Sequence, residues 1–195
     1  GGIDQSIRTV VIPGNHDVLD KDGKIDMTPY TQHLGKDRFA ERIGNAYLIG
    51  LNSNFMKNVE QNSLEERSQF AWLKKTLKKK HKKDHVIVFL HHPFFLENYG
   101  EEEGYSTLSE SIRNKYFSLF DEYGVEFVIA GHLHDNREAN HNGIEMVTTS
   151  AAGRQLGTAQ PGIRIIQLRK GNISQQYFTL EQLPDTRENV IASFK

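Results

Sequence analysis

Nitrogen and oxygen donors occur at three separate places in the chain, each directly after a short apolar segment. They stand in the motifs Gly-Asn-His-Asp (14–17), His-His-Pro (91–93) and Gly-His-Leu-His (131–134), and the donors are Asn15, His16, His91, His132 and His134. Neutral imidazole and amide oxygen suit Mn, Fe, Zn or Ni. Two such ions about 3.5 to 4 Å apart can activate water and neutralise phosphoryl oxygens. We therefore expect hydrolysis of a phosphate ester at a site with two divalent or trivalent metal ions.

The residue types suggest different roles within this set. Asn15, His91, His132 and His134 offer metal-ligand chemistry, whereas His16 is placed to donate a proton, because an imidazole ordinarily has a pKa near 6.5. One residue separates His132 from His134, and in an extended segment the two side chains would point to opposite faces. We expect a loop to turn them towards different metals.

The remaining histidines and one acidic residue are expected to be structural. Asp17 should cap or turn its loop rather than bind metal, and His92 should act as a neighbour of His91 rather than as a ligand. An isolated histidine is usually structural or solvated, and this applies to His33, His81, His85 and His141.

Strands should deliver the donors. Residues 8–12, 86–90 and 125–130 are short apolar runs rich in β-branched residues, and each ends immediately before a donor motif. The residues between them predict helices, one starting at Ser63 with the capping-box spacing to Glu66, and one over 108–123 that Gly124 closes. A donor at the end of a buried strand is held rigidly.

Other segments complete an α/β pattern. Thr28 and Pro29 predict the start of a short helix that ends near Gly35, and residues 46–51 predict a strand. Three further strands, at 144–149, 163–168 and 173–179, follow without a helix between them. The chain should therefore form α/β layers that finish in an antiparallel ribbon.

Composition excludes several classes of function. The 195 residues suffice for one domain, and 24 Lys plus Arg balance 25 Asp plus Glu, so we expect no nucleic acid partner. The lysines from 74 to 83 are interpreted as a solvated helix end. Cysteine is absent, which excludes thiolate chemistry. No apolar run reaches the roughly 18 residues of a membrane span, and the sequence leaves the compartment and the oligomeric state undetermined.

Taken in order, the three motifs resemble the calcineurin-like metallophosphoesterase superfamily. The resemblance to the superfamily extends to residues 69–73, which look like the helix that precedes the family's His-x-Pro strand. A narrower similarity, to the group of calcineurin-like phosphoesterase domain-containing proteins, rests on segments at 51–53, 88–97, 146–151, 155–157, 162–164, 176–178 and 180–183. The resemblance implies a four-layer αββα sandwich and a phosphomonoesterase of the serine/threonine protein phosphatase type, acting on a phosphorylated substrate that could be a phosphoprotein. It also implies that Asn15, His91 and His132 bind the second metal, that His134 binds the first, and that His16 is the proton donor.

The sequence departs from the family pattern at its beginning. The family's Asp-x-His and Gly-Asp-x-x-Asp motifs, which hold the first metal and supply the bridging carboxylate, have no counterpart here. We therefore expect residues 1–184 to be the C-terminal portion of the domain, N-terminally incomplete, and residues 185–195 to be a short tail. We expect little or no activity from these 195 residues alone.

Two other functions remain open on sequence grounds. The same donors could serve a phosphodiesterase that acts on cyclic nucleotides or nucleic acid, or the chain could be an inactive, metal-poor remnant or binding module. Three arginines, Arg113, Arg154 and Arg164, could each bind phosphate, and their spacing does not select one of them.

Overall fold

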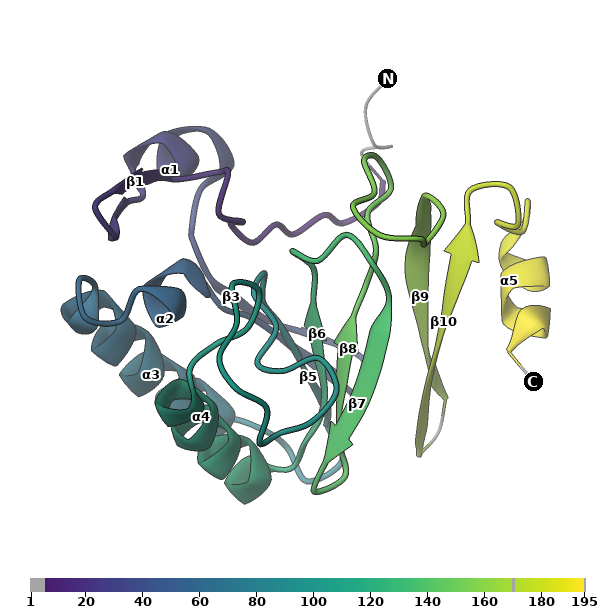
Figure 1. Cartoon of the computed structure of the whole chain (residues 1–195). Coiled ribbons are helices and arrows are strands. Elements are labelled where there is room, and N and C mark those ends of the chain that lie inside the picture. The colour runs from purple at the N-terminus through teal and green to yellow at the C-terminus, as the bar shows by residue number, and fades with distance from the viewer. Residues whose placement is uncertain (1–5, 170, 195) are drawn as a thin grey trace.

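A six-stranded mixed sheet forms the centre of the computed structural model, which describes residues 6–169 and 171–194 (Figure 1). Its order is β3-β4-β5-β6-β8-β7, with parallel pairing from β4 to β8 and antiparallel strands at both edges. The strands are β3 (Phe39–Ile43), β4 (Ala46–Gly50), β5 (His85–Phe89), β6 (Val125–Ala130), β7 (Arg137–His141) and β8 (Ile144–Thr148).

Helices cover one face of this sheet. They are α2 (Asn54–Lys57), α3 (Ser63–Leu77) and α4 (Glu110–Tyr123). Leu73 and Leu77 of α3 and Phe120 of α4 pack in one buried cluster with Val86 and Val88 of β5. Full burial of such a side chain contributes about 1.5 to 3 kcal/mol, so this layer accounts for much of the hydrophobic stabilisation.

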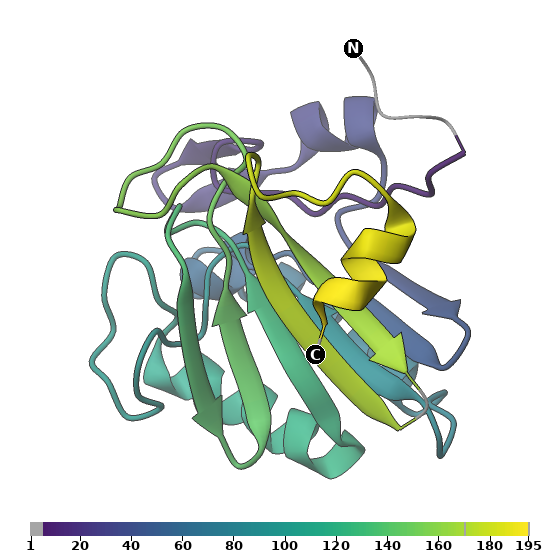
Figure 2. The same cartoon turned by 90° about the vertical axis from the view of Figure 1, so that its right-hand side faces the viewer.

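The opposite face is covered by a two-stranded antiparallel ribbon of β9 (Gly162–Arg169) and β10 (Asn172–Thr179) (Figure 2). Side chains alternate along a strand, so Val86 and Val88 face the helices while Ile87 joins the second cluster, where Ile166 and Leu168 of the ribbon pack. Both faces of β5 are therefore buried, as its continuous apolar sequence predicts.

Helix α5 (Arg187–Ser193) lies beyond the ribbon and completes the order helix, sheet, sheet, helix (Figure 1). The ring of Phe194, next to this helix, is 6.3 Å from the ring of Phe178 in β10, and Arg169 donates a hydrogen bond to the carbonyl of Ile191. The predicted αββα class with a terminal antiparallel ribbon is confirmed. Within the expected tail, residues 187–193 are helical.

Most predicted elements are present within a residue or two of their expected bounds. Gly124 ends α4 in the left-handed conformation (φ 61°), and α1 (Thr28–Leu34) stops at Gly35 (φ 90°). Six elements were not predicted: the edge strands β3 and β7, the hairpin of β1 (Leu19–Lys21) and β2 (Lys24–Asp26), and the short helices α2 and α5.

The predicted strand at residues 8–12 is wrong. This segment forms no ladder with any strand in the described part of the chain, and Val10 and Val11 are 41% and 42% exposed. A side-chain contact joins the segment to the sheet instead, because Arg8 forms an ion pair with Glu41 of β3. A β-branched run becomes a strand only where a neighbouring backbone accepts and donates the ladder hydrogen bonds.

The predicted capping box at the start of α3 is also wrong. Asn62 precedes the helix, and Glu66 is buried, with its carboxylate 2.7 Å from Nζ of Lys115 and 3.1 Å from the hydroxyl of Tyr116. Glu66 therefore joins α3 to α4. Asn62 accepts a hydrogen bond from the backbone N–H of Ile25 and so holds the β1–β2 hairpin.

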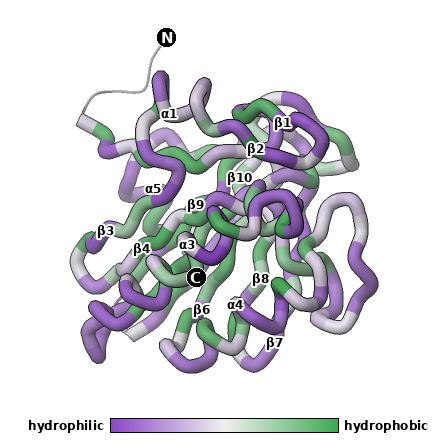
Figure 3. The backbone as a smooth tube through the Cα atoms, turned by 90° about the vertical axis from the view of Figure 1, so that its left-hand side faces the viewer, coloured by the Kyte–Doolittle hydropathy of each residue, from purple (hydrophilic) through white to green (hydrophobic). Residues whose placement is uncertain are grey.

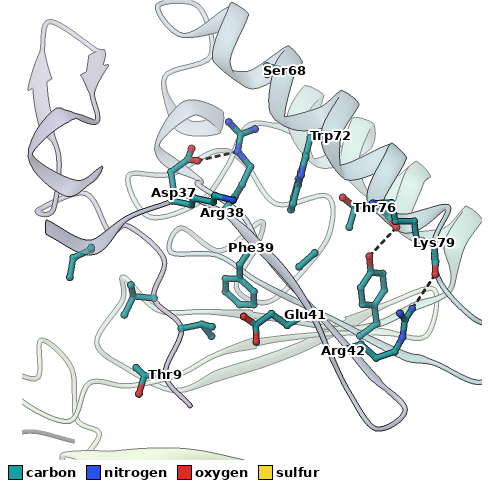
Figure 4. A pocket seen from close by; sticks show the side chains of 16 residues that line it. Thr9, Asp37, Arg38, Phe39, Glu41, Arg42, Ser68, Trp72, Thr76 and Lys79 are labelled. Atoms are coloured by element: carbon teal, nitrogen blue, oxygen red, sulfur yellow. Dashed lines mark hydrogen bonds and ion pairs between the residues drawn. The ribbon is translucent and has the colours of Figure 1, made fainter. Parts of the chain in front are cut away.

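Hydrophobic residues run along β4, β6 and β8, whereas many residues of the peripheral loops are hydrophilic (Figure 3). A groove of about 930 Å³ lies between residues 9–11, β3 and α3, where the guanidinium of Arg38 is 5.8 Å from the centre of the Trp72 ring (Figure 4).

No helix among residues 6–169 and 171–194 has the length and apolar character needed to cross a membrane.

Candidate metal centre

Two strand ends bring His91 and His132 together. Strands β5 and β6 are parallel neighbours, so their carboxyl ends lie at the same edge of the sheet, and the N–H of Gly131 donates to the carbonyl of His91 across this edge. His91 Nε2 is 3.0 Å from His132 Nδ1 and 2.8 Å from Oδ1 of Asn15. Donor atoms from three distant parts of the sequence therefore converge.

The loop that carries Asn15 is fixed by hydrogen bonds. The Asp17 carboxylate accepts the N–H of Gly14 at 2.8 Å, and the amide of Asn54 donates to the carbonyl of Gly14 at 3.2 Å. A Cβ on Gly14 would lie 3.0 Å from the His91 ring, so any larger residue would force this ring to shift by a few tenths of an ångström. The predicted structural role of Asp17 is confirmed. By contrast, a Cβ on Gly131 would have an ordinary contact of 3.9 Å with His91.

The spacing of these donors fits one metal ion. Ligands about 2.1 Å from a metal and at right angles to each other are about 3 Å apart, which matches the 2.8 Å and 3.0 Å separations around His91 Nε2. The other nitrogen of His132, Nε2, is buried and has no hydrogen-bond partner among the described residues. No hydrogen bond from the described residues to Nε2 therefore holds the His132 ring in a fixed orientation.

Burial keeps these imidazoles in the form that binds metal. Burial, with a contribution from nearby His132, lowers the pKa of His91 to about 4. Burial likewise lowers the pKa of His132, and His134 and Lys57 nearby act in the same direction. A metal ligand must be the neutral imidazole, and both side chains are neutral at pH 7.

The loop after β6 places His132 in this cluster and leaves His134 outside the group of ring nitrogens around His91. His132 and His134 have left-handed backbones, with φ of 65° and 52°, so the segment is not extended, and the predicted turn is confirmed. His134 Nδ1 donates to the carbonyl of Arg154 at 2.6 Å, which leaves Nε2 free, an arrangement typical of metal-binding histidines. His134 and the exposed His16 line a cavity of about 420 Å³ together with Asn15 and His132.

His92 lies beside the cluster but is held by a serine. Its Nδ1 is 2.9 Å from Oγ of Ser53, and the same oxygen accepts the N–H groups of His91 and His92. The Ser53 hydroxyl must then donate to Nδ1. Burial lowers the pKa of His92 to about 2. Its ring nitrogen lies close enough to those of His91 and His132 to form a group of three, although the bond to Ser53 favours a supporting role.

Sequence reasoning missed the polar residues that follow β4. These residues are Asn52, Ser53 and Asn54. The backbone N–H of Asn52 donates to the side-chain oxygen of Gln69 at 2.8 Å, and the side-chain amide of Gln69 donates to the carbonyl of Asn52 at 3.1 Å. All four residues are buried. The signal that could have revealed them is a run of three short polar residues, 52–54, directly after a buried strand.

Two of the three candidate phosphate-binding arginines are excluded. Arg113 is completely buried and donates to backbone carbonyls, including those of Glu101 and Leu108. The side chain of Arg164 is 5% exposed and forms an ion pair with Glu138. Arg154 is exposed, next to His134, and is the candidate that remains.

Comparison with known proteins gives the family. The calcineurin-like phosphoesterase family matches residues 2–136, which contain all three donor motifs. The chain belongs to the calcineurin-like phosphoesterase family. It is 31% identical over 186 residues to the human serine/threonine-protein phosphatase CPPED1 and 30% identical over 185 residues to the cattle protein of that name. Each match covers 94% of this chain and 59% of the relative, so the chain spans about three-fifths of the length of these relatives.

A solved structure shows the same fold at low sequence identity. GAP50, described as the anchor in the inner membrane complex of Plasmodium, superposes with a TM-score of 0.55 at 15% identity, over 73% of this chain and 49% of that one. At this identity the likeness extends to the fold alone.

Proposed function

We propose that the protein is a metal-dependent phosphoester hydrolase in which Asn15, His91 and His132 hold one metal ion. The observation that carries the proposal is the convergence of Asn15 Oδ1, His91 Nε2 and His132 Nδ1. Membership of the calcineurin-like phosphoesterase family supports it. The three side chains come from residues up to 117 positions apart (132 − 15), so their convergence is a product of the fold and not of closeness in the sequence.

His134 would hold a second ion through Nε2, since its Nδ1 is bonded to the carbonyl of Arg154. The ligand types suit Mn, Fe, Zn or Ni. When bound, two such ions activate water and neutralise phosphoryl charge. The group of three ring nitrogens around His91 includes no carboxylate from the described residues, so the donors present here serve mostly one of the two ions.

His16 would supply the proton for the leaving oxygen. It follows Asn15 directly, is exposed to the cavity that His132 and His134 also line, and has no structural hydrogen bond in the described part of the chain that would divert its ring. Imidazole donates protons readily near neutral pH.

The proposed substrate is a phosphomonoester on serine or threonine of a protein. Its support is the similarity to serine/threonine-protein phosphatases named CPPED1. The cavity of about 420 Å³ next to the donors has room for a phosphorylated side chain. Arg154 is exposed, and its carbonyl accepts a hydrogen bond from His134, which lines this cavity.

The proton-donor role is tested with His16→Ala in the full-length protein. We expect kcat for a phosphoserine peptide to fall about 10² to 10⁴-fold, the usual scale of general acid catalysis, while metal content stays unchanged. The matched control is His33→Ala, which removes an exposed histidine on α1. Parallel loss of metal and of kcat in His16→Ala would assign this residue to metal binding instead.

A further inference from the structure

An exposed aromatic ring stands over the donor cluster. Tyr105 is 80% exposed, yet its ring centre is 5.4 Å from that of His132. It lines the cavity of about 420 Å³ that contains His16 and also a second cavity of about 280 Å³ that contains Lys57. Asn15, His132 and Tyr105 are common to both cavities, so the ring forms part of the wall between them.

The loop that carries Tyr105 is held in place by hydrogen bonds from a lysine of α2. Nζ of Lys57, at the end of α2, donates to the carbonyls of Gly104 and Thr107 at 2.8 and 2.7 Å and to the carboxylate of Glu103 at 3.0 Å. These three acceptors flank residue 105 on both sides. All three N–H bonds of the ammonium are used, so Lys57 fixes the loop and has no donor left for a substrate.

The start of the same loop is fixed by a buried arginine. Arg113 donates to the carbonyls of Tyr99, Glu101 and Leu108. The Glu101 carboxylate in turn accepts the N–H groups of residues 96, 97 and 98. Charge-assisted hydrogen bonds of this kind are stronger than neutral ones, and they hold the loop at both ends although its tip is exposed.

We propose that Tyr105 is a specificity-determining residue whose ring packs against the apolar part of the group that carries the phosphate. An aromatic side chain that is mostly exposed contributes little hydrophobic stabilisation to the fold. A side chain that a rigid loop holds in place is suited to a binding contact. The ring lies beside the candidate metal ligand His132 and borders both cavities, so a phosphoester bound in either cavity would lie next to it. The inference rests on the proposed function and names the part of the substrate that the site recognises.

The test compares two non-hydrolysable probes, phenylphosphonate and methylphosphonate, in the full-length protein loaded with Mn²⁺. Dissociation constants are measured by calorimetry for the wild type, Tyr105→Ala and Tyr105→Phe. We expect the preference of the wild type for phenylphosphonate to fall about two- to tenfold in Tyr105→Ala, the range of one aromatic pair, and to persist in Tyr105→Phe. Leu64→Ala, which removes an exposed apolar side chain on α3, is the control.

The outcomes separate the two proposals. Equal preference in the wild type and Tyr105→Ala, with both proteins binding methylphosphonate, would overturn the role of Tyr105 and leave the metal site standing. Equal weakening of both probes in Tyr105→Ala would also overturn it, because a loop collapse rather than a lost ring contact would be the cause. A wild-type protein that binds neither probe would overturn the proposed function itself, and the role of Tyr105 with it.

Discussion

Acidification from pH 7 to pH 5 should destabilise this protein through two buried histidines. Burial lowers the pKa of His91 to about 4 and that of His92 to about 2, whereas an imidazole in the unfolded chain has a pKa of about 6.5. Below pH 6.5 the unfolded state therefore binds more protons than the folded state. The stabilisation is fully present above that pH and is lost as the pH falls towards the folded values.

The size of the loss follows from the two pKa values. At pH 5, keeping one imidazole neutral against an unfolded pKa of about 6.5 costs about 2 kcal/mol, compared with about 0.2 kcal/mol at pH 7. The result depends little on the folded pKa as long as it lies well below 5. His91 and His92 together should therefore remove about 3 to 4 kcal/mol, a large part of the 5 to 15 kcal/mol typical of a folded domain.

Urea unfolding at pH 7 and pH 5, with a chelator present to remove metal, measures this loss. His92→Asn keeps an acceptor for the Ser53 hydroxyl but removes one titrating group, so the difference between the two pH values should shrink by about 2 kcal/mol. His33→Asn, an exposed position on α1, should leave it unchanged. An unchanged pH dependence in His92→Asn would refute the reasoning, because other acidic groups would then cause the whole effect.

Three further perturbations test the arrangement around the site. Gly14→Ala places a Cβ 3.0 Å from the His91 ring, and we expect metal affinity, measured by calorimetry, to fall about tenfold; unchanged affinity would show that the loop adapts freely. Glu66→Ala leaves Lys115 and Tyr116 without their partner, and we expect a loss of about 2 to 3 kcal/mol in urea unfolding; a loss below 0.5 kcal/mol would contradict that role. Turnover of a phosphoserine peptide should exceed that of a cyclic nucleotide, and the reverse preference would identify a phosphodiesterase.

The sheet centre and the helices α1, α3 and α4 could be predicted because their signals are local. Strands β5 and β6 are mostly apolar and rich in β-branched residues, and α4 is closed by a glycine, Gly124, at its expected position. The edge strand β3 could not be predicted, since it is half-exposed and exists through its antiparallel pairing with β4. Residues 8–12 have the composition of a strand, but no neighbouring strand among the described residues pairs with them, so the predicted strand does not form.

The donors could be found from the sequence because His91, His132 and His134 follow buried strands and Asn15 stands in a Gly-Asn-His-Asp motif. The residues that support them could not be found in this way. Ser53 acts on His91 and His92 from 38 and 39 residues away, and Lys57 holds a loop 46 to 50 residues further along the chain. Glu66 carries a local capping signal that a partner 49 residues away overrides. Contacts of this range depend on how the helices pack, which no local pattern encodes.

Metal content shows whether Asn15, His91 and His132 hold a metal ion. Wild-type protein, His91→Ala and the control His33→Ala are incubated with Mn²⁺ or Zn²⁺, dialysed, and measured by mass spectrometry for metal per chain. We expect at least one ion per chain in the wild type and the control, and a clear loss in His91→Ala. Equal metal content in all three proteins, or none in the wild type, would contradict this expectation.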